Sequence, residues 1–488
     1  MTALREISGL PGPPRLPLLG NAHQVRAARL HVTAEQWCER YGPIFRFDLG
    51  VRRIVVISDL EEINCVLRDR PDGFRRAREV EGAELGFDDV FAADGVFSAE
   101  GDDWRRMRRL TVTALNSNHL QRYFHVVRTA TERLHRLLTE AAHDGRTLDI
   151  SRELTSFAVD VTSALAFGHD LNTLERRQNE LQGHIQRVFE MSGRRIFAPV
   201  PYWRWVKLPA DRALDRSLVE LRRAVEGFIE QARERMRARP RLHESPENFL
   251  EGMLAAQQAE GTFTDEEIIG NTLTLLNAGE DTTAHTMAWT IWCLAGMPDI
   301  QARWAAEARA VLGEHCFPVD YETIESLRYG EAVLRESMRL KSVAPVMLVE
   351  SLMETTIAGT HIPAGSRLLL LTRYACTQAG GAEYDPERWL GDDGHPAPDQ
   401  KSFLTFGAGP RFCPGRNLAF LESKTAMAMI ARNFEIELDP SAGPVSEVFS
   451  FTMIPKGLRV RLRERAAGKP IPVGATGRGN GNGSGNGL

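Results

Sequence analysis

The sequence lacks the features that mark several large classes of protein. No apolar run approaches the roughly 20 residues that a membrane helix needs, and residues 1–10 contain no apolar core of signal-peptide length. The six cysteines show no CxxC spacing, so neither a zinc knuckle nor a disulfide framework is indicated. There is also no GxGxxG fingerprint and no cysteine cluster for an iron–sulfur centre. These absences predict a soluble, reduced, cytoplasmic protein without a transmembrane anchor.

The chain has no excess of basic charge either. Its 60 Lys and Arg and 65 Asp and Glu leave a formal net charge of −5, which excludes a wholesale nucleic-acid binder and leaves room only for a local basic patch. Hydrophobic residues make up 43% and charged residues 26% of the 488 residues. Such a chain can bury a substantial core without disulfides or structural metals.

The residue distribution predicts one large, mainly α domain with a minor β-sheet region. Prolines and glycines crowd residues 1–20, which predicts a stiff, extended N-terminal segment. Residues 466–488 form a Gly/Asn-rich end that is expected to be disordered, because it can bury too little apolar surface to offset the entropy lost on ordering. The domain itself is placed at residues 21–465, since neither a break in composition nor an internal repeat divides it.

The longest helix is predicted to begin at Thr264, which can form a capping box with Glu267, and to run to Gly296. At ~1.5 Å per residue it would be roughly 50 Å long, a buried beam across the domain. Other helices are predicted at 34–40, through most of 104–313, and at 298–312, 324–340 and 416–430. Strands are predicted at 44–47, 54–57, 356–357, 367–371 and 459–462.

The most informative stretch is the glycine-rich loop around Cys413, which ends just before a predicted helix. Exposed amides and the helix dipole at such a position favour a thiolate over a thiol. A thiolate held by backbone amides suits an axial ligand to iron. The alternative is a small buried thiol, which is the commoner role of a single cysteine.

The spacing of Phe406, Gly409, Arg411, Cys413 and Gly415 resembles the haem-binding loop of the cytochrome P-450 family, whose members are haem-thiolate enzymes. The resemblance implies haem b (iron protoporphyrin IX) as the cofactor and Cys413 as its metal ligand. It also implies that Phe406 and Gly415 belong to the cofactor-binding loop, and that the single domain has the cytochrome P-450 fold.

A second segment resembles the Trp-x-x-x-Arg helix of this family. A spacing of four places Trp104 and Arg108 on one helix face, where the resemblance implies contact with a haem propionate. Arg411 is a further propionate candidate. An arginine that the family often carries after the helix with Glu336 is missing, and Val349 and Glu350 stand in that region instead.

The same helix carries additional arginines, Arg105, Arg106 and Arg109. We expect these three to form a solvated basic face, with docking of an acidic redox partner as their alternative role.

Polar residues interrupt the middle of the long helix, where they are costly unless they are bonded or used. The Thr282 hydroxyl can bond back to the carbonyl of Ala278, and Gly279 would allow a ring plane to approach closely. The alternative is that these polar residues form an acidic cluster that faces solvent at a helix bend, an arrangement that is plausible for Glu280. The stretch is similar to the oxygen-activation motif of cytochromes P-450, which implies that Asp281 and Thr282 are the acid–alcohol pair that relays protons to dioxygen.

Glu336 and Arg339 lie one turn apart, which by itself indicates only a common surface ion pair. The family carries such a Glu-x-x-Arg, and the later segment around Arg388 resembles the motif that supplies a third partner. The resemblance therefore implies a buried clamp with a structural role. The compressed segment 376–384 is expected only to reshape a surface loop.

The resemblance implies a monooxygenase that inserts one oxygen atom from O2 into a small-molecule substrate. The segments expected to line the pocket are rich in Leu, Phe, Val and Ala, which favours an apolar, medium-to-large substrate from lipid or secondary metabolism, hydroxylated or epoxidised. These segments are 83–97, 183–205, 275–282, 343–348 and 449–452. Two alternatives stay open: other haem-thiolate chemistry (a peroxygenase or oxidative coupling) and a non-catalytic haem sensor. Asp281 and Thr282 argue against peroxide use and sensing, since neither needs a proton relay.

The electron supply must come from outside the chain, because the sequence carries no flavin or iron–sulfur motif. Electrons from NAD(P)H are expected to arrive through a ferredoxin- or flavodoxin-type redox partner with its reductase. Only ten residues precede the first proline of the Pro-rich start, which predicts a soluble, bacterial-type form.

Overall fold

The computed structural model describes residues 4–50, 52–77, 95–176, 180–196, 198, 202–261, 263–391 and 403–465. Helices make up most of these residues and the strands form small sheets, which confirms the predicted mainly α fold with a minor β-sheet region. The predicted disordered segment at 466–488 lies outside the described residues.

The helices are α1 (Leu30–Tyr41), α2 (Leu60–Arg68), α4 (Gly101–Ala114), α5 (Ser117–His143), α6 (Ile150–Phe167), α7 (Glu180–Ile196), α8 (Pro209–Ala238), α9 (Phe249–Glu260), α10 (Asp265–Ala295), α11 (Pro298–Leu312), α12 (Tyr321–Glu325), α13 (Arg328–Leu340), α14 (Thr372–Gly380) and α15 (Arg416–Asn433). The helices predicted at 34–40, 298–312 and 416–430 are confirmed as α1, α11 and α15.

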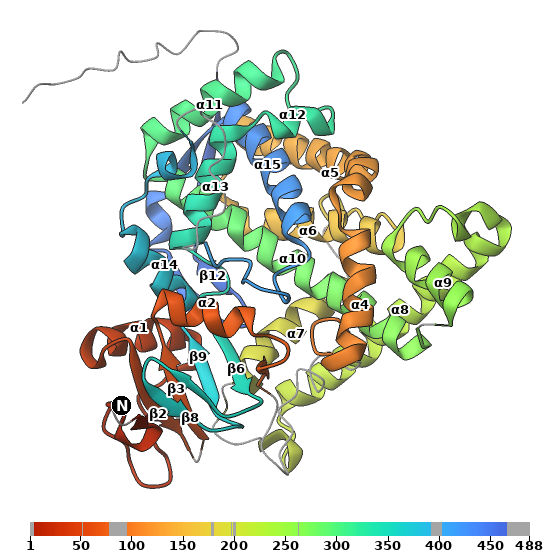
Figure 1. The fold of residues 1–488 in the computed structure, drawn as a ribbon. Helices are drawn as coiled ribbons and strands as arrows, with labels where there is room; N and C mark the ends of the chain where they lie inside the picture. The colour runs from red at the N-terminus through yellow and green to blue at the C-terminus, as the bar shows by residue number, and fades with distance from the viewer. Residues whose placement is uncertain are drawn as a thin grey trace, which may run out of the picture.

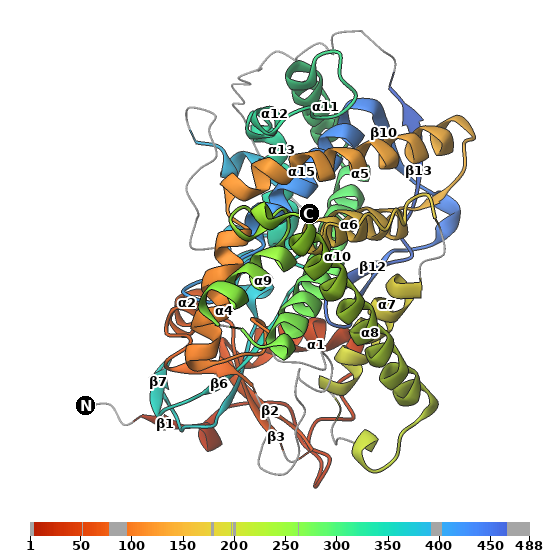
Figure 2. The same cartoon turned by 90° about the vertical axis from the view of Figure 1, so that its right-hand side faces the viewer.

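The strands are β1 (Arg5–Glu6), β2 (Ile44–Leu49), β3 (Arg52–Ile57), β4 (Phe74–Arg76), β5 (Leu148–Asp149), β6 (Met347–Ser351), β7 (Thr355–Ile357), β8 (Thr360–Ile362), β9 (Arg367–Leu370), β10 (Phe434–Leu438), β11 (Ser446–Phe449), β12 (Met453–Lys456) and β13 (Arg459–Glu464). The main sheet has the order β2-β3-β9-β6-β4. Its β3 and β9 run parallel, and its other neighbours are antiparallel. This sheet lies with α1 and α2 on one side of the molecule, and the long helices fill the rest (Figures 1 and 2).

The N-terminal segment packs onto the strands. β1 pairs with β8 in a small second sheet, and Leu10 is buried in the cluster that contains residues of the main sheet. Gly12 lies so close to β2 that a Cβ would meet the carbonyl oxygen of Arg46 at 2.0 Å. The prolines therefore stiffen a segment that is held against the domain.

The long helix α10 crosses the centre of the molecule (Figure 1). It begins with the predicted capping box, in which Thr264 and Glu267 each accept a hydrogen bond from the other's backbone amide. Most of its side chains are buried on every face, as expected for a helix that other helices surround. Its closest neighbour is α6, and the pair provides the rigid wall on which the site is built.

The single helix predicted over 324–340 is wrong in one respect, because the structure divides this stretch into α12 and α13. Leu327 breaks the helix with a ψ of 76°. Its side chain is buried beside Leu312 and Ala428. Tertiary burial of one leucine thus overrides the local helical pattern.

Candidate active site

A cavity of about 380 Å³ lies where the middle of α10, the start of α15 and the main sheet meet. Its wall is mostly apolar. Apolar residues of the wall include Val96, Phe97, Leu275, Val346, Leu348 and Phe451. Three of the predicted pocket segments, 275–282, 343–348 and 449–452, contribute to the lining, and so do the last two residues of 83–97. Residues 83–94, 197 and 199–201 lie outside the described chain, and the described part of the predicted segment 183–205 does not line this cavity.

Cys413 lines this cavity from a tight loop that ends at α15. The loop is closed by the Cys413 amide, which donates to the carbonyl oxygen of Phe406 at 2.8 Å. Gly409 has a φ of +69°, and a Cβ there would lie 2.5 Å from the carbonyl oxygen of Leu67. Both the backbone conformation and the close approach to α2 therefore require glycine. Gly415 is the N-cap of α15, as predicted for the residue just before the helix.

The start of a helix was expected to favour a thiolate at Cys413, but the pKa of this thiol is shifted upward, toward the neutral form. Burial raises the pKa of the thiol, and the Gly415 amide, the Arg108 and Arg76 charges and the Arg416 amide oppose this only in part. Because the net direction is upward, the protein alone does not hold a thiolate. A bound metal cation would supply the missing stabilisation, since coordination deprotonates a thiol.

The predicted propionate residues come together on one side of the cavity. Trp104 and Arg108 lie on α4 and line the cavity together with Arg411. The Arg411 guanidinium sits 4.5 Å from the centroid of the Trp104 ring. Arg411 also donates to the carbonyl oxygen of Ala99 at 2.6 Å and pairs with Glu100. Arg108 donates to the carbonyl oxygen of Phe412 at 2.6 Å, which ties α4 to the cysteine loop.

Two further arginines, Arg70 and Arg76, line the same cavity and were missed from the sequence. Arg70 is only 5% exposed, and its Nε and Nη2 have no hydrogen-bond partner among the described residues. Burial lowers the pKa of both guanidinium groups, and the like charges of Arg70 and Arg411 lower that of Arg76 further. No spacing signal could have found them, since Arg70 lies in the turn after α2 and Arg76 lies at the end of the short strand β4.

The predicted back-bond of Thr282 is confirmed: its hydroxyl donates to the carbonyl oxygen of Ala278 at 2.7 Å. Both residues line the cavity, and so does Gly279. The structure adds a reason for Gly279 that was not expected, because a Cβ there would lie 2.8 Å from the Thr162 hydroxyl of α6. The glycine is required by the close packing of two helices.

The solvent-facing alternative for Glu280 is wrong. Its side chain is buried, and its Oε2 lacks a hydrogen-bond partner in the part of the chain that the structure describes. Burial, with the charge of Asp281 added, raises the pKa of this carboxyl well above its ordinary value. Glu280 is therefore held as a neutral acid inside the protein.

Asp281 is buried and is absent from the cavity lining, so its carboxylate does not lie beside the Thr282 hydroxyl in an open groove. One carboxylate oxygen, Oδ2, accepts a hydrogen bond from Thr452. The other, Oδ1, lies 3.0 Å from Nδ1 of His285, one helical turn further along α10. The i, i+4 spacing could have revealed His285 in the sequence, whereas nothing local points to Thr452.

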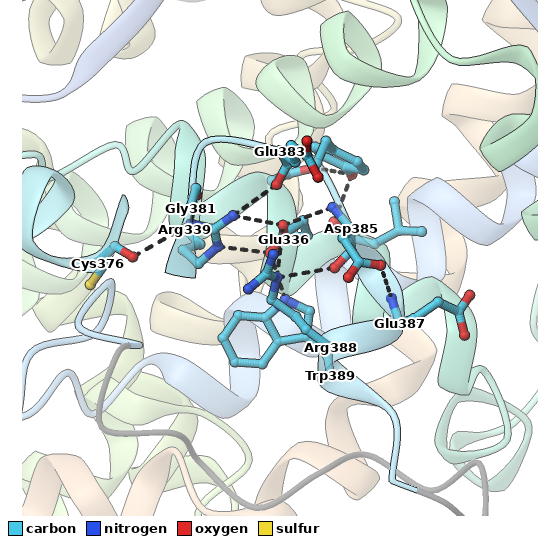
Figure 3. A network of polar contacts seen from close by, with 12 residues as sticks. Glu336, Arg339, Cys376, Gly381, Glu383, Asp385, Glu387, Arg388 and Trp389 are labelled. Carbon is cyan, nitrogen blue, oxygen red and sulfur yellow. Dashed lines mark hydrogen bonds and ion pairs between the residues drawn. The ribbon is translucent and has the colours of Figure 1, made fainter. Parts of the chain in front are cut away.

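Glu336 lies at the centre of a buried polar network behind the cavity (Figure 3). It is 0% exposed and its neighbour Arg339 is 1% exposed. Two parallel hydrogen bonds of 2.9 and 2.8 Å join the Arg339 guanidinium to the carboxylate. Arg388 donates to the same carboxylate at 3.1 Å and Trp389 at 2.8 Å. The structure thus brings together the three predicted clamp residues and adds an indole that was not predicted.

The segment 376–384 does more than the predicted reshaping of a surface loop. The carbonyl oxygens of Gly381 and Glu383 accept hydrogen bonds from Arg339 at 2.7 and 3.0 Å. The Tyr384 hydroxyl donates to the carbonyl oxygen of Val333 on α13 at 2.9 Å. A compressed segment is needed here because its backbone must reach a buried guanidinium.

The expected solvated basic face of α4 is only partly present. Arg106 forms a two-pronged ion pair with Glu267 at the start of α10. Arg105 pairs with Asp72 and Asp102 at 2.7 and 2.9 Å. Arg109 is exposed. Acidic neighbours within the chain therefore neutralise much of the surface expected to attract an acidic partner.

Comparisons with known proteins agree with this geometry. A family model described as Cytochrome P450 matches residues 10–462. The chain is 26% identical over 497 residues to putative cytochrome P450 CYP13A3 of Caenorhabditis elegans, covering 94% of both chains. It is 25% identical to the chloroplastic protein LUTEIN DEFICIENT 5 of Arabidopsis thaliana, covering 94% of this chain and 78% of that one. It is also 26% identical to the mitochondrial 25-hydroxyvitamin D-1 alpha hydroxylase of Mus musculus, covering 93% and 92%.

Proposed function

The chain belongs to the cytochrome P450 family of haem-thiolate monooxygenases, and on that premise we propose that it inserts one oxygen atom of O2 into an apolar, medium-to-large organic substrate by hydroxylation or epoxidation. The observation that carries the proposal is that Cys413 and Thr282 line one mostly apolar cavity. When bound, the haem supplies a thiolate-ligated iron that activates dioxygen.

The residues around the cavity fit a haem. Cys413 would be the axial ligand, and Phe406 and Gly415 shape its loop. Arg70, Arg76, Arg108 and Arg411 border the cavity, and Glu100 pairs with Arg411. Guanidinium groups gathered at one buried site are costly unless anions balance their charge. The two propionates of a haem would do so, and Arg70 would stand in for the arginine that is missing near Val349.

The wall of the cavity supports an apolar substrate. Leu275, Val346, Leu348 and Phe451 present hydrocarbon surface, and burial of matching apolar surface is the main source of affinity in such sites. We propose a role in lipid or secondary metabolism on this basis.

We propose that electrons from NAD(P)H reach the site through a separate ferredoxin- or flavodoxin-type partner with its reductase, because the sequence has no flavin or iron–sulfur motif. No helix of the described residues combines the length and apolarity that crossing a membrane demands. The relatives quoted above come from animals and a plant, so they lend no support to a bacterial-type, cytoplasmic form, which stays a prediction. The division at residues 20 and 465 also stays a prediction.

Thr282→Ala tests the proposed function. The variant should keep haem and substrate binding, since alanine is the better helix former, but it should uncouple electron use from product formation. The lost hydroxyl is the group that would hold a proton donor in the cavity, and a positioned proton relay contributes roughly 10²–10⁴-fold to the step it serves. The measurement is the yield of product and of hydrogen peroxide per NAD(P)H consumed, with a surrogate reductase system and a confirmed substrate.

Thr290→Ala is the matched control. Thr290 makes the same type of bond, to the carbonyl oxygen of Thr286 at 2.9 Å in the same helix, but it is fully buried and does not line the cavity. The control should therefore keep the wild-type yields. Equal yields in Thr282→Ala and wild type would contradict the assigned role. Product formed with peroxide alone at the full rate would favour a peroxygenase, and haem binding without any product would favour a sensor.

Arg70→Met should weaken haem retention, because it removes a buried cation with unpartnered nitrogens beside the predicted propionates. The rate of haem transfer to an excess of apomyoglobin measures this directly, without any activity. Arg68→Met, on the exposed side of α2, is the control with the same change of charge. Identical transfer rates for the two variants would remove Arg70 from the haem site.

A further inference from the structure

The hydroxyl of Thr452 connects the cavity to the buried carboxylate of Asp281. Thr452 lies between β11 and β12 and lines the cavity, although it is itself buried. Its Oγ1 donates to Oδ2 of Asp281. Since Asp281 does not line the cavity, the Thr452 hydroxyl connects its carboxylate to the cavity contents.

The second carboxylate oxygen faces His285. The distance from Oδ1 to Nδ1 is 3.0 Å, and both side chains are buried. Burial alone would lower the pKa of His285, but Asp281 more than offsets this, so the net shift is upward. Burial would raise the pKa of Asp281, yet His285 and Thr452 bring it below its ordinary value. The pair is therefore held as an imidazolium beside a carboxylate.

The other charges around this pair are few among the described residues. Glu280 on α10 lies next to Asp281 and is held neutral by burial. Asp149, at the start of α6, adds a negative charge that also raises the pKa of His285. The charges that act on His285 among the described residues, those of Asp281 and Asp149, are both negative and favour the imidazolium.

We propose that Thr452, Asp281 and His285 form a proton relay into the cavity, with Thr452 as the group that delivers the proton and His285 as its store. This inference rests on the proposed monooxygenase function and assigns it two residues that the motif of α10 does not contain. The relay differs from the Thr282 site, whose hydroxyl bonds to the carbonyl of Ala278.

The proton balance of the relay closes. Nδ1 of His285 lies near Oδ1 of Asp281 without being aligned to it, so the imidazole first turns about its Cβ–Cγ bond and then releases the Nδ1 proton to Oδ1. The carboxyl group of Asp281 turns about its own Cβ–Cγ bond. It then passes one proton to Thr452 Oγ1, whose own proton goes to an oxygen atom held in the cavity. One proton leaves His285 and one enters the cavity, so Asp281 and Thr452 return to their starting states and His285 is reprotonated from solvent.

Thr452→Val tests the delivering group, because valine keeps the shape of the side chain and removes only the hydroxyl. We expect the haem-loaded variant to give roughly 10²-fold less product per NAD(P)H, the lower end of what a positioned proton donor contributes, with the difference appearing as hydrogen peroxide. Thr452→Ser restores a hydroxyl and should restore most of the yield. Wild-type yields in Thr452→Val would overturn the relay.

The pH dependence of the product yield tests whether His285 stores the proton. The yield of product per NAD(P)H in the wild type should fall as pH rises through the pKa of His285, because the imidazolium is then lost. His285→Gln should give a low yield without that transition. A residue with a purely structural role would lower the yield at every pH and leave the transition in place.

A measurement without turnover fixes the pKa itself. The holoenzyme is labelled with ¹⁵N-histidine and studied by NMR as the reduced carbon monoxide complex. The signals of His285 are identified as those that are missing from the spectrum of His285→Gln. We expect their titration midpoint to lie above the ordinary value of a histidine side chain, and to fall in Asp281→Asn. An unshifted midpoint in both proteins would contradict the inference.

Failure of the relay can be told apart from failure of the proposed function. If the wild type forms no product with any reductase system, the monooxygenase function itself fails. If the wild type is well coupled while Thr452→Val and His285→Gln match it, only the relay is refuted.

Discussion

Cys413→Ser is expected to abolish the far red-shifted Soret band that the reduced, carbon monoxide-bound wild type should show. That band is characteristic of thiolate ligation, and a serine hydroxyl cannot supply the same ligand. The loop itself should persist, because the bond from the residue 413 amide to the Phe406 carbonyl and the turn at Gly409 involve backbone only. Monooxygenase activity should fall below detection together with the band.

Cys65→Ser controls for the general effect of removing a thiol. Cys65 is an exposed free cysteine on α2, so its replacement should leave the spectrum unchanged. A Cys413→Ser protein that kept the band would mean that another residue ligates the iron, and the candidate site would be misassigned.

Glu336→Ala is expected to give little soluble, haem-loaded protein. The carboxylate accepts hydrogen bonds from Arg339, Arg388, Trp389 and the Asp385 amide. Its removal leaves the Arg339 guanidinium, which is 1% exposed, without its charge partner. Breaking a buried pair in this way costs about 3–5 kcal/mol, a large share of the roughly 5–15 kcal/mol by which folded proteins are stable. The measurement is the yield of holoprotein and its thermal midpoint.

Arg388→Ala should be destabilising but less so, because the Arg388 side chain is 20% exposed and water can solvate part of what it leaves. Glu387→Ala is the matched control, because Glu387 lies beside Arg388 on the same short 3-10 helix, Pro386–Trp389. Its side chain forms an exposed ion pair with Arg303, and such pairs contribute about 1 kcal/mol or less. Normal recovery of haem-loaded Glu336→Ala would show that the clamp is no more important than this surface pair.

Local patterns in the sequence were sufficient for much of the architecture. The capping box at Thr264 and Glu267 sets the start of α10, and the alternating residues of β2 and β3 pair as expected. The loop around Cys413 was also readable, since its turn depends on glycines close in sequence. In each case the cause lies within a few residues, where hydrogen bonds and backbone preferences act regardless of the rest of the chain.

What the sequence by itself could not decide are the partners of buried polar groups. The carboxylate of Asp281 accepts a hydrogen bond from Thr452, which is 171 residues away and which nothing near Asp281 in the sequence indicates. Gly279 is required by the close packing of Thr162 from another helix, and Arg70 lines the cavity from a turn that carries no motif. These choices depend on desolvation: a polar group that folding removes from water must bond to whatever the packed helices bring within reach, and only the tertiary structure determines which groups those are.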